Sequence, residues 1–271
     1  MEKLEYLDCD YKKYLERIGF EGEAQPDLQT LIKLQEKHVK AIPYENLEIM
    51  DRKKITLDIP ALYDKIVVRK RGGYCFELNG LFAWLLEEIG FTVIQHFGRW
   101  YKGENVENPP MRRHRILRVP IDGVDYICDV GVGMTAPRKP LLFKMDAIQE
   151  ICEQKYRIIT DDTDIYLVQF LQSDNTWENV YSLNDDPCIP IDFYLPHYFC
   201  TTYPESPFIL STLVYINTEN GSHMIKDTQD PTTSEKIQIL ICFLQVLFGQ
   251  SCKTFLDIVA CPNWTKLQSF G

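Results

Sequence analysis

The chain has 271 residues, of which 45% are hydrophobic and 25% are charged, and its formal net charge is −10. This composition is typical of a globular protein and argues against disorder, and the length allows two or three modest domains or one large one. The acidic charge argues against a protein that binds nucleic acid or lies on an anionic membrane. Any anionic ligand therefore needs a local basic patch.

The nine cysteines are odd in number, and no two have the C-x-x-C spacing of a zinc ribbon. The sequence also shows no signal-peptide pattern, so we expect reduced cysteines in a cytoplasmic protein that holds no metal. The longest apolar run, residues 237–248, is too short to cross a membrane.

The first part of the chain predicts four helices. Residues 11–18, 27–39 and 60–68 carry apolar side chains near helical spacing, with aspartates positioned as caps before the second and third. Residues 75–89 give the clearest pattern, a wide apolar stripe that ends at Gly90.

The middle part predicts an antiparallel sheet or small barrel, because short segments rich in β-branched and aromatic residues replace the helical pattern. These segments are residues 92–101, 114–119, 124–130, 156–160, 165–171 and 177–183.

The cluster from Asp185 to Pro190 predicts a boundary after the sheet. Beyond it we expect helices at residues 191–199 and 235–248 and strands at 209–217 and 223–226, although a buried strand fits residues 235–248 nearly as well. The predicted domains are residues 1–90, 91–189 and 190–271.

Cys75 is the candidate nucleophile. It follows the glycines of Arg-Gly-Gly-Tyr-Cys-Phe-Glu-Leu-Asn, residues 71–79, and begins the clearest helix. The unpaired N–H groups and positive end of a helix favour a thiolate, so we expect a lowered pKa for Cys75. The alternative is an inert buried thiol.

A cysteine nucleophile needs a base, usually histidine, and the chain has five histidines. His38 lies between Lys37 and Lys40, so we expect it on a solvated helix face. His114 can be placed more closely, because Asp122 and Gly123 predict a two-residue hairpin turn downstream of it. The expected register pairs Leu117 with Cys128, Ile116 with Asp129, and His114 with Gly131.

This register places His114 and Asp129 on one face of the sheet, as diagonal neighbours roughly 7–8 Å apart at the backbone. An imidazole and a carboxylate can bridge that distance, and Gly131 leaves space beneath the ring. Asp129 carries the lone charge of residues 126–132, which is costly in an apolar strand unless it is paired. The alternative is a half-exposed strand on which Asp129 faces water.

Several motifs resemble those of the arylamine N-acetyltransferase family. Residues 71–79 match its R-G-G-x-C-x-E-x-N signature, and residues 43–47 resemble its P-F-E-N-L segment. His114, the D-x-G-x-G pattern of residues 129–133 and residues 201–208 follow in the family's order. The resemblance implies a triad of Cys75 as nucleophile, His114 as base and Asp129 as the orienting carboxylate.

The resemblance also implies an α+β fold. Its parts would be an N-terminal helical bundle related to the papain and transglutaminase core, a central antiparallel β-barrel and a C-terminal α/β lid. The implied reaction transfers an acetyl group from acetyl-CoA to the nitrogen of an arylamine or hydrazine through acetyl-Cys75. Two positions depart from the family pattern: Arg113 replaces a small residue, and Val132 stands where an aromatic residue is frequent.

Contacts with coenzyme A and the amine are predicted less directly. The candidates for coenzyme A are Gly131, Gly133, Arg138, Lys139 and Arg113, which combine a glycine turn with basic side chains. The candidates for the amine pocket are Tyr44, Tyr74 and Val132. The alternatives are a hydrolase or transglutaminase with the same triad, an amide synthase that uses a larger acyl donor, or a binding protein without turnover.

Overall fold

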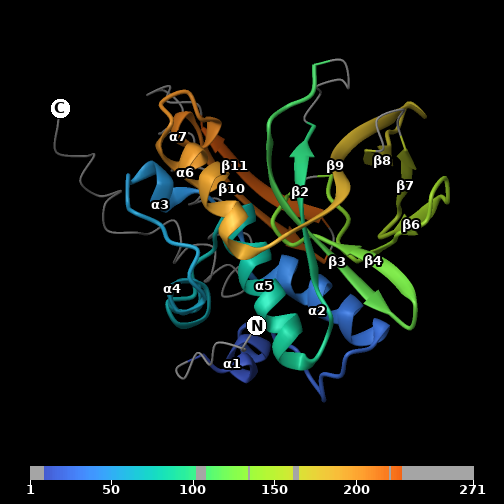
Figure 1. Ribbon diagram of the computed structural model, residues 1–271, viewed down its shortest axis with the longest axis horizontal. Coiled ribbons are helices and arrows are strands. Elements are labelled where there is room, and N and C mark those ends of the chain that lie inside the picture. Colours follow the sequence, from blue (N-terminus) through green and yellow to red (C-terminus); the bar gives the residue numbers. More distant parts are fainter. Residues whose placement is uncertain (1–8, 102–107, 134, 161–164, 220, 228–271) are drawn as a thin grey trace.

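The computed structural model describes residues 9–101, 108–133, 135–160, 165–219 and 221–227, so the helix predicted at residues 235–248 lies outside the described residues. The fold mixes helices with two antiparallel sheets (Figure 1). No helix among the described residues is long and apolar enough to cross a membrane.

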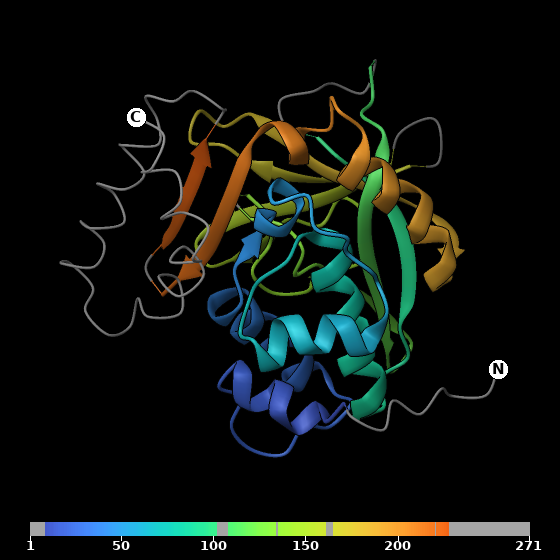
Figure 2. The ribbon, with the colours of Figure 1, turned by 90° about the vertical axis from the view of Figure 1, so that its left-hand side faces the viewer.

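The four helices predicted in the first part of the chain are confirmed. Asp27 caps the second of them by accepting a hydrogen bond from the Thr30 N–H at 2.7 Å, and Gly90 ends the last with a φ of 111°. Figures 1 and 2 show these helices packed together at one end of the molecule. They are α1 (Tyr11–Arg17), α2 (Leu28–Ala41), α4 (Ile59–Tyr63), which the π-helix η1 (Asp64–Val68) continues, and α5 (Cys75–Ile89). A further short helix, α3 (Leu47–Met50), was not predicted and packs against later parts of the chain.

Helix α5 links this helical layer to the larger sheet. Leu78 and Phe82 of α5 share one buried core with Leu31 of α2 and with Leu117 and Val119 of the sheet. The first turn of α5 is therefore held against the sheet by apolar burial.

The larger sheet has eight strands in the order β5-β4-β3-β2-β9-β8-β7-β6, and every pairing is antiparallel. Its two end strands are joined by Gln149, whose side chain accepts from the Leu142 N–H at 2.8 Å and donates to the Leu142 carbonyl at 2.9 Å. The sheet is thus a nearly closed barrel. Its strands are β2 (Ile94–Trp100), β3 (Arg112–Ile121), β4 (Val124–Cys128), β5 (Leu141–Leu142), β6 (Gln149–Ile151), β7 (Gln154–Thr160), β8 (Tyr166–Leu171) and β9 (Trp177–Cys188).

The strand predicted at residues 177–183 extends further, into the cluster that marks the predicted boundary, which is a correction of the strand's end. Strand β9 continues to Cys188, and Pro187 pairs with His96 of β2. Strand β8 pairs with β9 only as far as Leu183, so this end of β9 has a ladder on one side alone. A proline is tolerated there because its missing N–H interrupts no second ladder.

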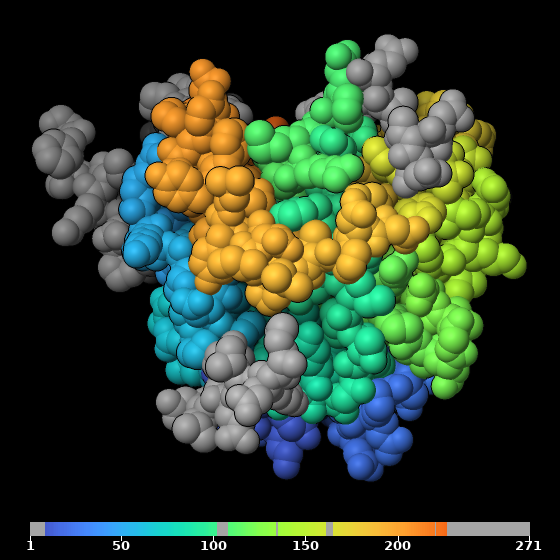
Figure 3. Space-filling model, viewed as in Figure 1, coloured from blue at the N-terminus to red at the C-terminus, as the bar shows by residue number. Residues whose placement is uncertain are grey.

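A smaller sheet, in the order β1-β10-β11, pairs a strand from the first part of the chain with two strands from the last described part. Tyr44 of β1 pairs with Tyr215 of β10, so the first and third predicted domains share this sheet, and the division into three domains stays a prediction. The helix predicted at residues 191–199 is confirmed. The chain around this helix, orange in Figure 3, covers one face of the molecule between the blue N-terminal part and the green part that forms the first strands of the larger sheet. The elements are β1 (Tyr44–Glu45), the 3-10 helix η2 (Pro190–Phe193), α6 (Tyr194–Thr202), α7 (Pro207–Leu210), β10 (Thr212–Thr218) and β11 (Gly221–Asp227).

Candidate active site

Cys75 is the first residue of α5, and its side chain is 3% exposed. Tyr74 precedes it in extended conformation and donates its N–H to the Glu77 carboxylate at 3.1 Å, which satisfies one unpaired donor of the helix start. The Cys75 sulfur donates to the carbonyl oxygen of Arg113 at 3.7 Å. The helix start therefore holds the thiol against the strand that carries His114.

The predicted hairpin register is confirmed where β3 and β4 pair. Leu117 faces Cys128, and Asp122 and Gly123 both have positive φ, 51° and 78°, as a type I′ turn requires. Strand β4 ends at Cys128, so Asp129 lies just beyond the ladder.

His114 and Asp129 meet as the register predicts. His114 Nε2 and Asp129 Oδ2 are 2.5 Å apart, and each residue is 2% exposed. The alternative of a carboxylate facing water is therefore excluded. Because Nε2 is engaged by the carboxylate, Nδ1 is the ring nitrogen left to exchange a proton with a nucleophile.

Asn79 fixes Asp129 to the helix of the nucleophile. Its amide donates to Asp129 Oδ1 at 2.8 Å and to the Arg115 carbonyl at 2.6 Å, and its carbonyl accepts from the Val130 N–H at 2.9 Å. From the sequence, Asn79 was identified only as the last residue of the matched motif. Its spacing, four residues after Cys75 on the same helix face, is the signal that could have identified it.

Aromatic rings enclose the imidazole. The His114 ring lies edge-on to Trp100 with centroids 6.2 Å apart, and the Tyr181 ring lies 6.0 Å away on a tilted plane. Trp100 was not predicted as a site residue, because nothing local in the sequence shows which face of β2 approaches His114.

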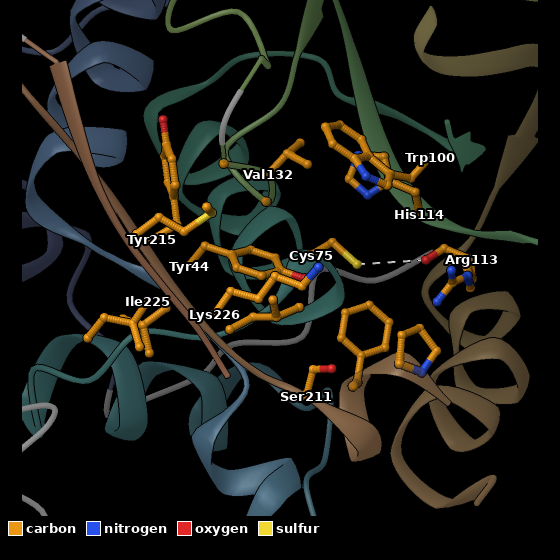
Figure 4. Close-up of a pocket in the computed structure, with 17 residues that line it drawn as sticks. Tyr44, Cys75, Trp100, Arg113, His114, Val132, Ser211, Tyr215, Ile225 and Lys226 are labelled. Atoms are coloured by element: carbon orange, nitrogen blue, oxygen red, sulfur yellow. Dashed lines mark hydrogen bonds between the residues drawn. The ribbon is translucent and has the colours of Figure 1, made fainter. Parts of the chain in front are cut away.

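Cys75 and His114 both line one cavity of about 350 Å³, which is within the range of small-molecule sites (Figure 4). Of the residues predicted for coenzyme A or the amine, Tyr44, Arg113, Gly131, Val132 and Gly133 lie on its wall. The other lining residues are Trp100, Pro207, Phe208, Ser211, Leu213, Val214, Tyr215, Met224, Ile225 and Lys226.

Tyr74, predicted for the amine pocket, does not line this cavity. Its side chain is fully buried, packs edge-on against Phe76 and Phe208, and its hydroxyl forms a short hydrogen bond with His197 Nδ1. Tyr74 therefore connects α5 to α6 behind the cavity wall.

The expected lowered pKa of Cys75 is wrong for the protein without ligand. Burial raises the pKa of the thiol well above its ordinary value, and Cys200 and Asp129 raise it further. Arg113 and the Phe76 backbone N–H pull it down, but the helix start does not compensate for burial. A thiolate at Cys75 would therefore need an added positive charge nearby, and a protonated imidazole on the same cavity wall would supply one.

The glycines of residues 129–133 allow close packing. A side chain at Gly131 would place its Cβ 2.6 Å from the Cys75 Cα, and one at Gly133 would lie 2.4 Å from the Tyr215 ring. The Gly131 N–H donates to Asp129 Oδ1 at 2.8 Å. These glycines let the residues after β4 reach the helix start, and their contact with coenzyme A stays a prediction.

Arg138 and Lys139 make contacts away from the cavity wall. Arg138 donates to the carbonyls of Thr218 at 3.0 Å and Gly221 at 2.8 Å, which fastens it to the β10–β11 turn. Lys139 lies 3.4 Å from a carboxylate oxygen of Glu36. Binding of coenzyme A phosphates by these two side chains also stays a prediction.

A second polar cluster lies on the other side of the first turn of α5. Lys65 Nζ is 2.7 Å from Glu77 and 3.2 Å from Glu48, and Lys65 and Glu77 are almost fully buried. Burial opposes the charge of Lys65, but the neighbouring glutamates outweigh it and raise the pKa of the ammonium. A separate ion pair joins Arg71 to Glu45, with 3.6 Å between a guanidinium nitrogen and a carboxylate oxygen.

His38 is fully buried, which corrects the expectation of a solvated face. Its Nδ1 lies 2.8 Å from the Tyr14 hydroxyl, and its ring meets Phe82 edge-on. The flanking lysines misled the prediction because adjacent helix positions point about 100° apart.

Comparison with known proteins agrees with this geometry. The family model described as N-acetyltransferase matches residues 27–237. The arylamine N-acetyltransferase of Mycolicibacterium smegmatis is 32% identical over 225 residues, which are 81% of this chain and 81% of that protein.

Solved structures share the fold. That of the Nocardia farcinica arylamine N-acetyltransferase has a TM-score of 0.77 at 30% identity and covers 96% of both chains. The Mycobacterium marinum enzyme in complex with CoA has a TM-score of 0.77 at 27% identity, covering 90% of this chain and 94% of that one. The chain therefore belongs to the arylamine N-acetyltransferase family of acyltransferases.

Proposed function

We propose that the protein transfers an acetyl group from acetyl-CoA to the nitrogen of an arylamine or hydrazine by a ping-pong mechanism. The observation that carries the proposal is the arrangement of Cys75, His114 and Asp129. The thiol and the imidazole line one cavity, while the carboxylate holds Nε2 and leaves Nδ1 for proton transfer.

In the first half-reaction, His114 Nδ1 takes the proton of the Cys75 thiol, and the thiolate attacks the carbonyl carbon of acetyl-CoA. The bond between that carbon and the coenzyme A sulfur then breaks, and the leaving thiolate takes the proton from the imidazolium. The acetyl group remains on Cys75 as a thioester. Asp129 stabilises the imidazolium while it carries the proton.

In the second half-reaction, the amine nitrogen attacks the acetyl carbonyl carbon and gives a proton to His114. The bond to the Cys75 sulfur breaks, and the thiolate recovers that proton as the amide leaves. The aromatic and aliphatic wall of the cavity, which includes Trp100, Phe208 and Val132, restricts water around the thioester. The CoA complex of the Mycobacterium marinum relative supports coenzyme A as the carrier.

Intact-protein mass spectrometry tests the first half-reaction. After incubation with acetyl-CoA alone, we expect one added acetyl group, located on the Cys75 peptide and absent from Cys75→Ser. Cys200→Ser is the matched control, because Cys200 is also buried and shares a core cluster with Cys75. It should remain acetylated on Cys75.

Addition of an arylamine should then remove the acetyl group and release the N-acetylated product. A hydrolase would instead lose the acetyl group to water at the same rate with or without amine. A protein that acquires no acetyl group from acetyl-CoA, but does acquire a longer acyl group from another acyl-CoA, would point to amide synthesis with a larger donor.

A further inference from the structure

The charge of the cavity is opposite to that of the whole chain. The chain carries a formal net charge of −10, yet the described lining residues include the cations Arg113 and Lys226 and no carboxylate. The rest of the wall is largely aromatic and aliphatic. A cavity of this kind favours a ligand with an apolar body and a negative group.

Arg113 is the cation at the reacting centre. Its backbone carbonyl accepts the hydrogen bond from the Cys75 sulfur at 3.7 Å, and its guanidinium lies over the Phe208 ring, 5.5 Å from the centroid. Burial raises the pKa of Cys75, Tyr44 and Cys200, and Arg113 lowers all three, which places its charge among these groups.

The Arg113 guanidinium has no carboxylate partner among the described residues. A half-buried cation beside apolar rings has lost part of its hydration. An anionic ligand would compensate for the lost water contacts by pairing with the guanidinium. Figure 4 shows Arg113 and Lys226 on opposite sides of Cys75 in that view. Lys226 is solvent-exposed, whereas Arg113 is partly buried.

The phosphates of coenzyme A are poor partners for Arg113. When the acetyl carbonyl is at the Cys75 sulfur, the whole pantetheine arm separates it from the diphosphate. The group beside Arg113 during the second half-reaction is the amine acceptor, because coenzyme A has already left. The contact with coenzyme A that the sequence predicts for Arg113 therefore fits the site less well than a contact with the acceptor.

We propose that Arg113 selects arylamine acceptors that carry a carboxylate on the ring, so that aminobenzoates are preferred over neutral anilines. The inference rests on the proposed acetyl transfer. The ring would pack against the aromatic wall near Phe208, and the carboxylate would pair with the guanidinium, which can bind two oxygens at once.

The test compares 4-aminobenzoate with its neutral isostere 4-aminobenzamide as acceptors. We expect the wild-type kcat/KM to favour the carboxylate by roughly 10- to 100-fold, the scale of a hydrogen bond to a charged group. Arg113→Gln should reduce that ratio to near one. Arg113→Lys should retain part of it, and circular dichroism should show that both variants fold.

Lys226→Gln is the matched control, since it removes the other cation of the same cavity. It should keep the carboxylate preference, and an equal loss in both glutamine variants would overturn the role of Arg113. In ping-pong kinetics the kcat/KM for acetyl-CoA is measured separately from that of the amine. If Arg113→Gln lowers only the value for acetyl-CoA, the guanidinium serves coenzyme A and the proposal is wrong.

A binding measurement separates this proposal from the proposed function. Calorimetry with 4-acetamidobenzoate and 4-acetamidobenzamide needs no turnover, and we expect tighter binding of the carboxylate by wild type but not by Arg113→Gln. If this preference appears without acetyl transfer, the proposed function fails and Arg113 still selects an anion. If transfer occurs with no charge preference, the role of Arg113 is wrong and the function stands.

Discussion

The two sides of the first turn of α5 hold buried polar clusters of different kinds. On one side, Cys75 and Asn79 face His114 and Asp129 at the cavity. On the other, Glu77 faces Lys65 within the helical layer. Both clusters are almost fully buried, and both place a carboxylate beside a nitrogen base.

The clusters differ in whether a titratable atom remains available at the cavity. Lys65 is held between Glu77 and Glu48, and none of these three residues lines the cavity. His114 has one nitrogen engaged by Asp129, and its ring lines the cavity wall. The comparison teaches that burial and pairing alone stabilise, whereas reactivity also requires a group that remains unpaired at a cavity.

The largest expected effect is on the catalytic side. In Asp129→Asn, the amide oxygen can still accept from Asn79 and the Gly131 N–H, so the protein should fold. The amide nitrogen would then face His114 Nε2 and force a proton onto Nδ1, which could no longer accept one from Cys75. We expect the acetylation rate of Cys75 to fall by roughly 10³- to 10⁴-fold, as measured by quenched-flow mixing followed by intact-protein mass spectrometry. A variant that keeps a tenth of the wild-type rate would refute this role.

On the structural side, Lys65→Met should remove stability rather than turnover. The change leaves Glu77 buried without its cation and leaves Glu48 with the more exposed Arg69, 3.4 Å away, which we expect to cost about 3–5 kcal/mol in urea unfolding. The double variant Lys65→Met with Glu77→Gln should recover part of that loss, because the remaining amide is neutral and can still accept from the Tyr74 N–H. If the folded fraction of Lys65→Met loses turnover as severely as Asp129→Asn, the cluster around Lys65 is not purely structural and the comparison is wrong.

Asn79→Ala should affect both properties. It leaves the Val130 N–H without its partner and removes one of the two donors to Asp129 Oδ1, so we expect a loss of about 1–3 kcal/mol in unfolding free energy together with slower acetylation. In a double-mutant cycle, Asn79→Ala should slow Asp129→Asn little further, since both act through the same imidazole. Additive effects on the rate would show that Asn79 acts elsewhere.

The smallest effect concerns His38, a buried histidine that has no carboxylate partner in the described part of the chain. Burial, with a smaller contribution from Arg17, lowers the pKa of His38 from 6.5 to about 3. The unfolded chain binds the proton first, so this contribution to stability is complete above pH 6.5 and declines as the pH falls toward 3. Between pH 7 and pH 5, about 2 kcal/mol should be lost through this group.

His38→Gln tests this pH dependence, because the amide can still accept from the Tyr14 hydroxyl but does not titrate. Unfolding free energies at pH 7 and pH 5 should differ less in His38→Gln than in wild type. Equal differences in the two proteins would mean that another group controls the acid sensitivity.

Local patterns were enough to predict much of the site. The turn at Asp122 and Gly123 determines the register of β3 and β4, and that register places His114 beside Asp129. The helix from Cys75 to Ile89 was predicted with its observed bounds, since its apolar stripe and Gly90 are signals within one element.

Features that depend on packing between distant elements were not predicted. Trp100 approaches His114 because it lies two residues beyond Gly98, which pairs with His114 across β2 and β3, and the pKa of Cys75 rises because other layers bury it. Arg138 contacts the β10–β11 turn rather than the cavity for the same reason. Each depends on neighbours that belong to other elements of the chain.

The carboxamide of Asn79 has a mechanical consequence. The sulfur belongs to the helical layer and the imidazole to the barrel, so bending between these layers would ordinarily pull the two apart. By fastening Asp129 and Val130 to the helix that begins at Cys75, Asn79 makes the reacting groups move as one rigid body. Remote strands such as β6, β7 and β8 can therefore vary in length or flex thermally without misaligning the chemistry.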